Sequence, residues 1–136
     1  MIQYNFESDF ELKDQDKLSD WIHKVVSEES CVLGDLNYVF CDDEYLHKIN
    51  VEFLDHDTLT DIISFDYSLG KTLHGDIYIS VERVQENAEE YNVSFEEELH
   101  RVMVHGILHY CGYKDKTKQD AKLMREKENH YLKLLG

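Results

Sequence analysis

Two histidines four residues apart, followed by a glycine and a carboxylate, are the residues of this chain best suited to chemistry. The segment reads His105-Gly-Ile-Leu-His109-Tyr-Cys-Gly112-Tyr-Lys-Asp115. On a helix, His105 and His109 project from the same face, so one divalent cation can bind both. Gly112 ends the helix and lets the chain turn back, which can bring Asp115 to the same ion. Two histidines and one carboxylate leave a coordination position open for water, as catalytic zinc sites do.

A histidine pair at this spacing also occurs in proteins without a metal, but here it lies in an apolar segment, where unpartnered imidazoles are costly. The same spacing occurs in zinc peptidases with the pattern His-Glu-x-x-His-x-x-Gly-x-x-His. In this chain Gly106 stands where that pattern has its general base, and Asp115 stands where it has its last histidine. Loss of the base argues against this form of peptide hydrolysis, and a metalloprotease with an atypical zinc motif remains the alternative.

The elements that must position these residues are predicted from hydrophobic periodicity. We expect strands at 2–7, 36–41, 60–67 and 75–81, and helices at 15–29, 42–53, 81–91, 94–112 and 117–135. A strand–helix–strand run predicts a parallel pair with a crossover helix, and the turn-like residues 68–71 predict a hairpin. Ser94 is expected to cap a central, buried helix that carries the histidines. The fold class is therefore α+β, a single domain over residues 1–136 with a small mixed β-sheet covered by helices.

Length and composition agree with one ordinary domain. The 136 residues are 42% hydrophobic, which is enough for a core. No apolar run reaches the roughly 18 residues of a membrane span, and the N-terminus lacks the pattern of a secretory signal. Three cysteines with no repeating spacing make a disulfide framework improbable. We therefore expect a cytoplasmic protein with no membrane partner.

Charge is distributed unevenly along the chain. The formal net charge is −15, yet residues 101–136 carry eight basic and four acidic side chains. The basic side chains concentrated after the histidine motif are Lys116, Lys118, Lys122, Arg125 and Lys127. They form either a solvated helix face or an anion-binding edge beside the motif.

Three separate motifs resemble those of the YbeY-type endoribonucleases, also described as rRNA maturation factors. Their hallmark His-Gly-x-Leu-His-x-x-Gly-Tyr-Asp-His is similar to residues 105–115. Their Thr-Asp-Val-Leu-Ser-Phe is similar to residues 60–65, and their Gly-Asp-Ile to residues 75–77. The three matches occur in family order.

The resemblance implies a metal-dependent RNA hydrolase that acts in rRNA maturation and ribosome quality control. It implies a Zn²⁺ site in which His105 and His109 carry over directly, while Asp115 replaces the family's third histidine. Single-stranded RNA is the expected substrate, because the sequence contains no duplex-reading motif. Ribosomal or small-subunit proteins are the expected partners. A zinc-stabilised ribosome assembly factor that binds RNA without cutting it is the non-enzymatic alternative.

One departure concerns an arginine that the family usually has before the Thr-Asp motif and that is proposed to act on the RNA phosphate. The aligned residue here is Leu54, which cannot imitate a guanidinium. We expect residues 54–56 to approach the metal cleft, with a neighbouring cation, Arg101, Lys114 or His56, in compensation. The alternative for Arg101 is an ion pair with Glu97 one turn earlier on the same helix.

The remaining candidates come mainly from the hairpin motifs. Ser64, Phe65 and Lys114 are predicted to face the substrate, although Phe65 fits ordinary sheet structure equally well. Asp76 and Arg101 are candidate catalytic residues. Asp76 would either orient a metal-bound histidine or help to activate water.

Overall fold

The computed structural model describes residues 1–54 and 60–135 and contains a four-stranded sheet with five helices in that part of the chain. The elements are β1 (Ile2–Phe6), α1 (Gln15–Glu28), β2 (Val32–Cys41), α2 (Asp43–Leu54), β3 (Ile62–Asp66), β4 (Thr72–Ser80), α3 (Val81–Glu90), α4 (Phe95–Tyr110) and α5 (Lys118–Leu135). The predicted α+β class is confirmed.

The sheet is mixed, with the strand order β1-β2-β4-β3. β1 pairs with β2 in parallel, and α1 forms the crossover between them. β3 and β4 pair antiparallel, which confirms the hairpin. β2 begins at Val32, whereas the strand was predicted to begin at residue 36. The register between β2 and β4 shifts between Leu33 and Leu36. That irregularity interrupts the alternation on which the prediction relied.

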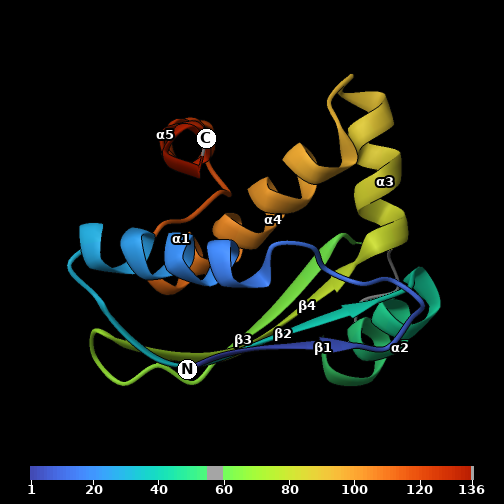
Figure 1. The fold of residues 1–136 in the computed structure, drawn as a ribbon, viewed down its shortest axis with the longest axis horizontal. Helices are drawn as coiled ribbons and strands as arrows, with labels where there is room; N and C mark the ends of the chain where they lie inside the picture. Colours follow the sequence, from blue (N-terminus) through green and yellow to red (C-terminus); the bar gives the residue numbers. More distant parts are fainter. Residues whose placement is uncertain (55–59, 136) are drawn as a thin grey trace.

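Helices cover the sheet on both faces. α1 and α4 lie across one face, above the strands in Figure 1, and the main core forms between these two helices and the sheet. α2 packs on the opposite face, where Leu46 joins Cys41 and Ile63 in a smaller core. Phe53, near the end of this helix, is exposed.

Helix α4 crosses the centre of the covered face and ends where its motif predicts. The Ser94 hydroxyl accepts a hydrogen bond from the Glu97 backbone N–H, which caps the first turn. At the other end, Cys111 is the C-cap and Gly112 follows it with φ +104°, a conformation that suits glycine. The N–H of Tyr113 donates to the carbonyl of Leu108, so the chain reverses in a Schellman motif. The residues after Gly112 therefore turn back toward α4.

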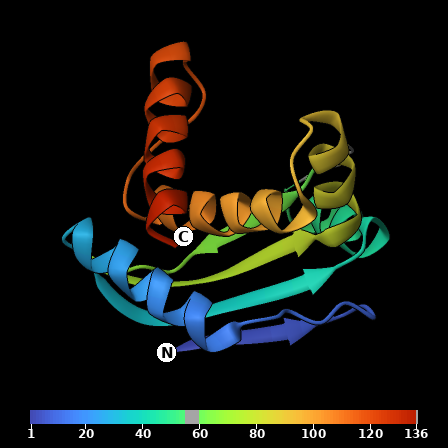
Figure 2. The same ribbon diagram turned by 45° about the horizontal axis from the view of Figure 1, so that its top comes forward.

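Helix α5 stands at the end of α4 and against α1 (Figure 2). Thr117 caps it by accepting a hydrogen bond from the Asp120 N–H. Met124, Glu128 and Tyr131 are its buried residues, and their spacing defines one face. The Trp21 indole donates to the Tyr131 carbonyl at 2.8 Å, which fixes α5 to α1. This contact holds the buried face of α5 close to the histidines of α4.

Candidate metal centre

The three residues of the sequence motif converge on one point. His105 and His109 lie one turn apart on α4, and their Nε2 atoms are 2.9 Å apart. The Asp115 Oδ2 atom lies 3.2 Å from the His105 Nε2 and 3.3 Å from the His109 Nε2. The three side chains could therefore bind one metal ion, with one donor atom contributed by each.

The other ring nitrogen of each histidine is held by a neighbouring group. The His105 Nδ1 lies 2.7 Å from the Glu128 Oε2, and the His109 Nδ1 lies 2.9 Å from the Tyr113 carbonyl oxygen. Both partners are acceptors, so each Nδ1 carries the proton and each Nε2 presents a lone pair. The two Nε2 lone pairs and the Asp115 carboxylate then face one another with no proton between them. This donor set fits a divalent cation, which would relieve the repulsion.

Glu128 joins the candidate metal centre to Arg101. Its side chain is only 6% exposed and accepts a hydrogen bond from the Arg101 Nη1 at 3.1 Å. Arg101 therefore pairs with Glu128 on α5, and the alternative considered for it, an ion pair with Glu97, is wrong. Helical spacing suggested a partner on the same helix, but the tertiary contact with α5 provides a buried carboxylate, which is the stronger acceptor.

Glu128 also raises the tendency of His105 to be protonated. Burial disfavours the charged form of His105, but the Glu128 hydrogen bond and charge, with Asp115 and Asp61 behind them, outweigh it and raise the pKa of His105. The carboxylates that orient the His105 ring therefore also favour its protonation.

A second carboxylate fixes the loop that carries Asp115. Glu29, at the end of α1, accepts a hydrogen bond from the Tyr113 hydroxyl at 2.7 Å and a short one from the Tyr131 hydroxyl. Lys127 lies 3.3 Å from the same carboxylate. Because the Tyr113 carbonyl holds His109, Glu29 acts on the metal centre through Tyr113. Lys127, which was predicted to belong to the basic face, therefore forms an ion pair with Glu29.

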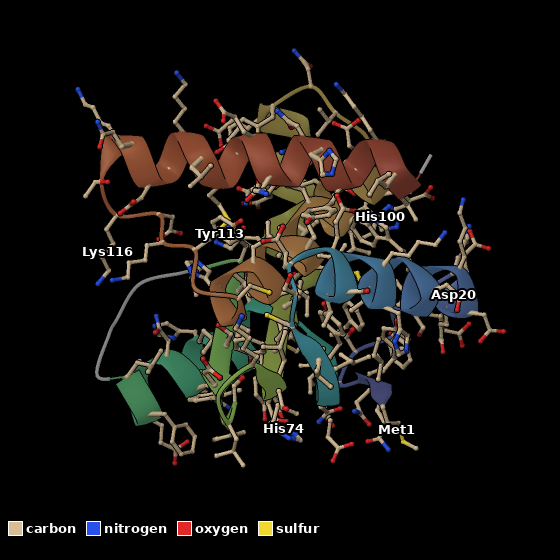
Figure 3. The ribbon with its side chains drawn as sticks, turned by 90° about the vertical axis from the view of Figure 1, so that its left-hand side faces the viewer. Met1, Asp20, His74, His100, Tyr113 and Lys116 are labelled. Atoms are coloured by element: carbon tan, nitrogen blue, oxygen red, sulfur yellow. The ribbon has the colours of Figure 1, made fainter. Side chains whose placement is uncertain are left out.

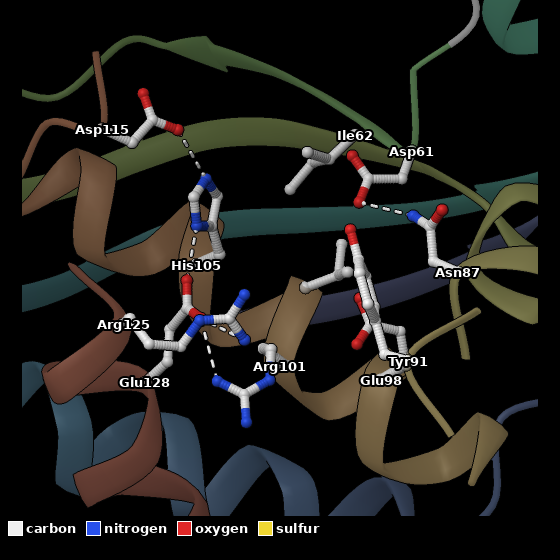
Figure 4. A pocket seen from close by; sticks show the side chains of 11 residues that line it. Asp61, Ile62, Asn87, Tyr91, Glu98, Arg101, His105, Asp115, Arg125 and Glu128 are labelled. Atoms are coloured by element: carbon white, nitrogen blue, oxygen red, sulfur yellow. Dashed lines mark hydrogen bonds and ion pairs between the residues drawn. The ribbon is translucent and has the colours of Figure 1, made fainter. Parts of the chain in front are cut away.

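A cavity of about 250 Å³ opens beside His105 and Asp115 (Figure 4). Its walls come from α3, α4, α5 and the segment leading into β3. Two of its carboxyl groups are poorly hydrated. Burial raises the pKa of Asp61 against the opposing influence of His105, and burial likewise raises the pKa of Glu98 against that of Arg101. Neither carboxyl group was predicted from the sequence to belong to the site.

The hairpin candidates divide between the two faces of the sheet. Ser64 pairs with Ile77, whose side chain packs toward α4 beside Gly106, so Ser64 lies on the face that carries the metal centre. Phe65 pairs with Asp76 on the opposite face, and both line a groove formed with α2. The prediction that Asp76 orients a metal-bound histidine or activates water there is therefore wrong. The alternation of side chains along β4 directs Asp76 away from α4.

The basic residues around the motif occupy different environments. Lys114 and Lys116 are exposed in the loop between α4 and α5, and Lys116 lies at its outer edge in Figure 3. Lys114 directly precedes the ligand Asp115, where it was predicted to face substrate. Leu54 is the last residue of α2, which packs on the opposite face of the sheet. Residues 54–56 were expected to approach the metal cleft, but Asp55 and His56 lie outside the described residues.

The sequence of this chain is similar to those of known proteins. The family model described as Endoribonuclease YbeY matches residues 3–136. This chain belongs to the YbeY endoribonuclease family. The Endoribonuclease YbeY of Flavobacterium johnsoniae is 61% identical over 129 residues, which cover 95% of this chain and 93% of the relative. That of Flavobacterium psychrophilum is 58% identical over 134 residues, which cover 98% and 96%.

A solved structure shows the same arrangement of elements. The solution structure of TM1509 from Thermotoga maritima matches this chain with a TM-score of 0.71 at 29% identity, covering 99% of this chain and 89% of the other. The family resemblance drawn from the three motifs is thus confirmed.

Membership of the YbeY family also agrees with the packing of Gly106, the residue that replaces the general base of zinc peptidases. A Cβ atom at Gly106 would lie 3.1 Å from the Ile77 Cδ1 and 3.2 Å from the Ile62 Cδ1. A side chain at this position would therefore require the ends of Ile77 and Ile62 to shift by a few tenths of an ångström. The absence of a side chain at Gly106 lets α4 pack tightly on β3 and β4.

Glu128 is the main site residue that the sequence analysis missed. A signal for it exists, because Met124, Glu128 and Tyr131 share the buried face of a helix whose other positions are mostly polar. A carboxylate at an apolar position needs a charged or hydrogen-bonding partner. His105 and Arg101 are those partners.

Proposed function

We propose that this chain is a zinc-dependent endoribonuclease that cleaves single-stranded RNA during rRNA maturation. The observation that carries the proposal is the convergence of His105, His109 and Asp115 beside a polar cavity. Two imidazole nitrogens and one carboxylate oxygen are a ligand set typical of catalytic zinc. Membership of the YbeY family supports RNA as the substrate.

A divalent ion held by these ligands would polarise a phosphoryl oxygen and lower the pKa of a bound water molecule. The protein contributes the orientation of the ligands. Glu128 and the Tyr113 carbonyl keep the Nε2 lone pairs of the two histidines directed at the same point. The cavity next to His105 admits part of the polynucleotide chain to that point.

The test is cleavage of a labelled single-stranded RNA by wild-type protein before and after treatment with a chelator. We expect cleavage to stop in the chelator and to return when Zn²⁺ is added back. The His109→Ala variant should stay inactive with Zn²⁺ present, because it lacks one of three ligands. Cleavage of casein in place of RNA would instead support a metalloprotease, and RNA binding without cleavage would support an assembly factor.

The cellular context is the second part of the proposal. Among the described residues, no helix is long and apolar enough to cross a membrane. We place the activity in the cytoplasm, with ribosomal or small-subunit proteins as partners that deliver the RNA. Sedimentation of a cell extract tests this, since co-migration with ribosomal subunits is expected. Migration only at the position of the free protein would contradict it.

A further inference from the structure

The cavity beside the metal centre has two walls of different chemistry. One wall comes from α5 and presents Arg125, and the facing wall presents Asn87 of α3 and Tyr91 (Figure 4). The metal ligands His105 and Asp115 lie at its edge. The volume of about 250 Å³ is below the roughly 300–1,000 Å³ of pockets that hold whole small-molecule ligands, so the cavity suits one unit of a longer chain. The dimensions therefore suit an extended single strand that enters one unit at a time.

Arg125 is the cation at this cavity that remains open to a ligand. Glu128 already accepts close contacts from His105 at 2.7 Å and Arg101 at 3.1 Å. Arg125 lies 3.9 Å from the same carboxylate, beyond hydrogen-bond length, and its side chain is 56% exposed. The Arg101 side chain is only 15% exposed. A guanidinium with free N–H groups beside a metal centre is suited to bind a phosphate with two parallel hydrogen bonds.

Tyr91 supplies the aromatic surface. It is 56% exposed at the rim of the cavity, across from Arg125. Single-stranded nucleic acids bind where a cation follows the backbone and an aromatic ring stacks on a base. The two side chains provide these two features on opposite walls of one cavity.

The position of Asp61 in the cavity agrees with a phosphate on the Arg125 wall and a base on the Tyr91 wall. Asp61 accepts a hydrogen bond from Asn87 at 3.4 Å, and it lies on the side of the cavity away from Arg125 in Figure 4. Carboxylates repel a phosphate but accept hydrogen bonds from the amino groups of a base. A nucleotide is therefore expected to direct its phosphate toward Arg125 and its base toward the opposite wall.

We infer that this cavity is a subsite for one nucleotide of single-stranded RNA, in which Arg125 binds the phosphate and Tyr91 stacks on the base. The inference rests on the proposed endoribonuclease function and specifies how its substrate is held. It also assigns the phosphate contact to a residue of α5, whereas the sequence analysis considered Arg101, Lys114 and His56.

The test combines RNA binding with cleavage kinetics. Binding of a fluorescent single-stranded oligoribonucleotide is measured by anisotropy in chelator, where the strand stays intact. Arg125→Gln is compared with Lys133→Gln, which removes the same charge from the last turn of α5. Tyr91→Leu is compared with Tyr67→Leu, since Tyr67 is 58% exposed but lies beside the groove that α2 forms on the opposite face of the sheet.

We expect Arg125→Gln to raise the Kd about tenfold and to flatten the plot of log Kd against log salt by about 0.7, the value for one phosphate contact on a single strand. Tyr91→Leu should raise the Kd about tenfold with no change of salt slope. In cleavage with Zn²⁺, both variants should raise KM more than they lower kcat. The two controls should stay within about twofold of wild type.

Two results would overturn the inference in distinguishable ways. If wild-type protein cleaves RNA while Arg125→Gln and Tyr91→Leu match their controls in Kd and KM, the subsite is wrong and the endoribonuclease proposal stands. If wild-type protein neither binds nor cleaves RNA with Zn²⁺ present, the proposed function fails and the subsite fails with it.

Discussion

Replacing Glu128 by glutamine should disable the metal centre although Glu128 is not itself a ligand. The carboxylate accepts from the His105 Nδ1 at 2.7 Å and from the Arg101 Nη1 at 3.1 Å. A glutamine has one acceptor oxygen for these two donors. If the oxygen faces Arg101, the amide NH₂ faces His105 and favours the tautomer protonated on Nε2. That tautomer has no lone pair to offer to a metal at the Nε2 atom.

The opposite orientation of the glutamine is also unfavourable. It would keep the His105 tautomer but place an NH₂ group against Arg101, which is largely buried and would lose its charged partner. We therefore expect Glu128→Gln to weaken metal binding about 10–100-fold, the range for loss of a group that orients a metal-bound histidine. The loss of a charged hydrogen bond should also lower stability by about 1–3 kcal/mol.

The assay is competition for Zn²⁺ against a chromophoric chelator at constant pH, together with thermal unfolding of the metal-free protein. Glu126→Gln is the matched control, because Glu126 is exposed on the same helix and the charge change is identical. A Glu128→Gln protein that melts at a lower temperature but binds Zn²⁺ within threefold of wild type would refute the reasoning. In that case Glu128 would support only the packing of α5.

Three further predictions concern the surroundings of the site. Burial opposes ionisation of Glu29, but its hydrogen bonds outweigh burial and lower the pKa of Glu29 on folding. Glu29 therefore stabilises the fold above its unfolded pKa, and this stability is lost as the pH falls through its folded pKa, so Glu29→Gln should flatten the acid side of a plot of unfolding free energy against pH. Tyr113→Phe and Tyr131→Phe each remove one hydroxyl from Glu29, but only Tyr113→Phe should weaken Zn²⁺ binding, because the Tyr113 carbonyl holds His109; equal Zn²⁺ affinities would contradict this. Gly106→Val should destabilise the protein by about 1–3 kcal/mol through overpacking against the sheet, and an unchanged melting temperature would show that the sheet can yield there.

The sequence alone predicted the features that depend on neighbouring residues. Helix periodicity placed His105 and His109 on one face, and the glycine after α4 predicted the reversal that brings Asp115 back to them. Capping by Ser94 and the hairpin of β3 and β4 were likewise predicted correctly. All of these follow from spacing within one element or from one short turn, which local sequence encodes directly.

Tertiary structure decided which residues far apart in the chain meet. No local pattern favours Glu128 over Glu97 as the partner of Arg101, because the choice depends on how α5 packs against α4. Asp76 was misplaced because period-two alternation assigns it a face only once the register and the covering helices are known. The cavity between α3, α4 and α5 has the same origin, since no single segment forms it. Long-range packing, which sums many weak contacts, fixed the surroundings of the candidate metal site. Its three predicted ligands lie within eleven consecutive residues of the sequence.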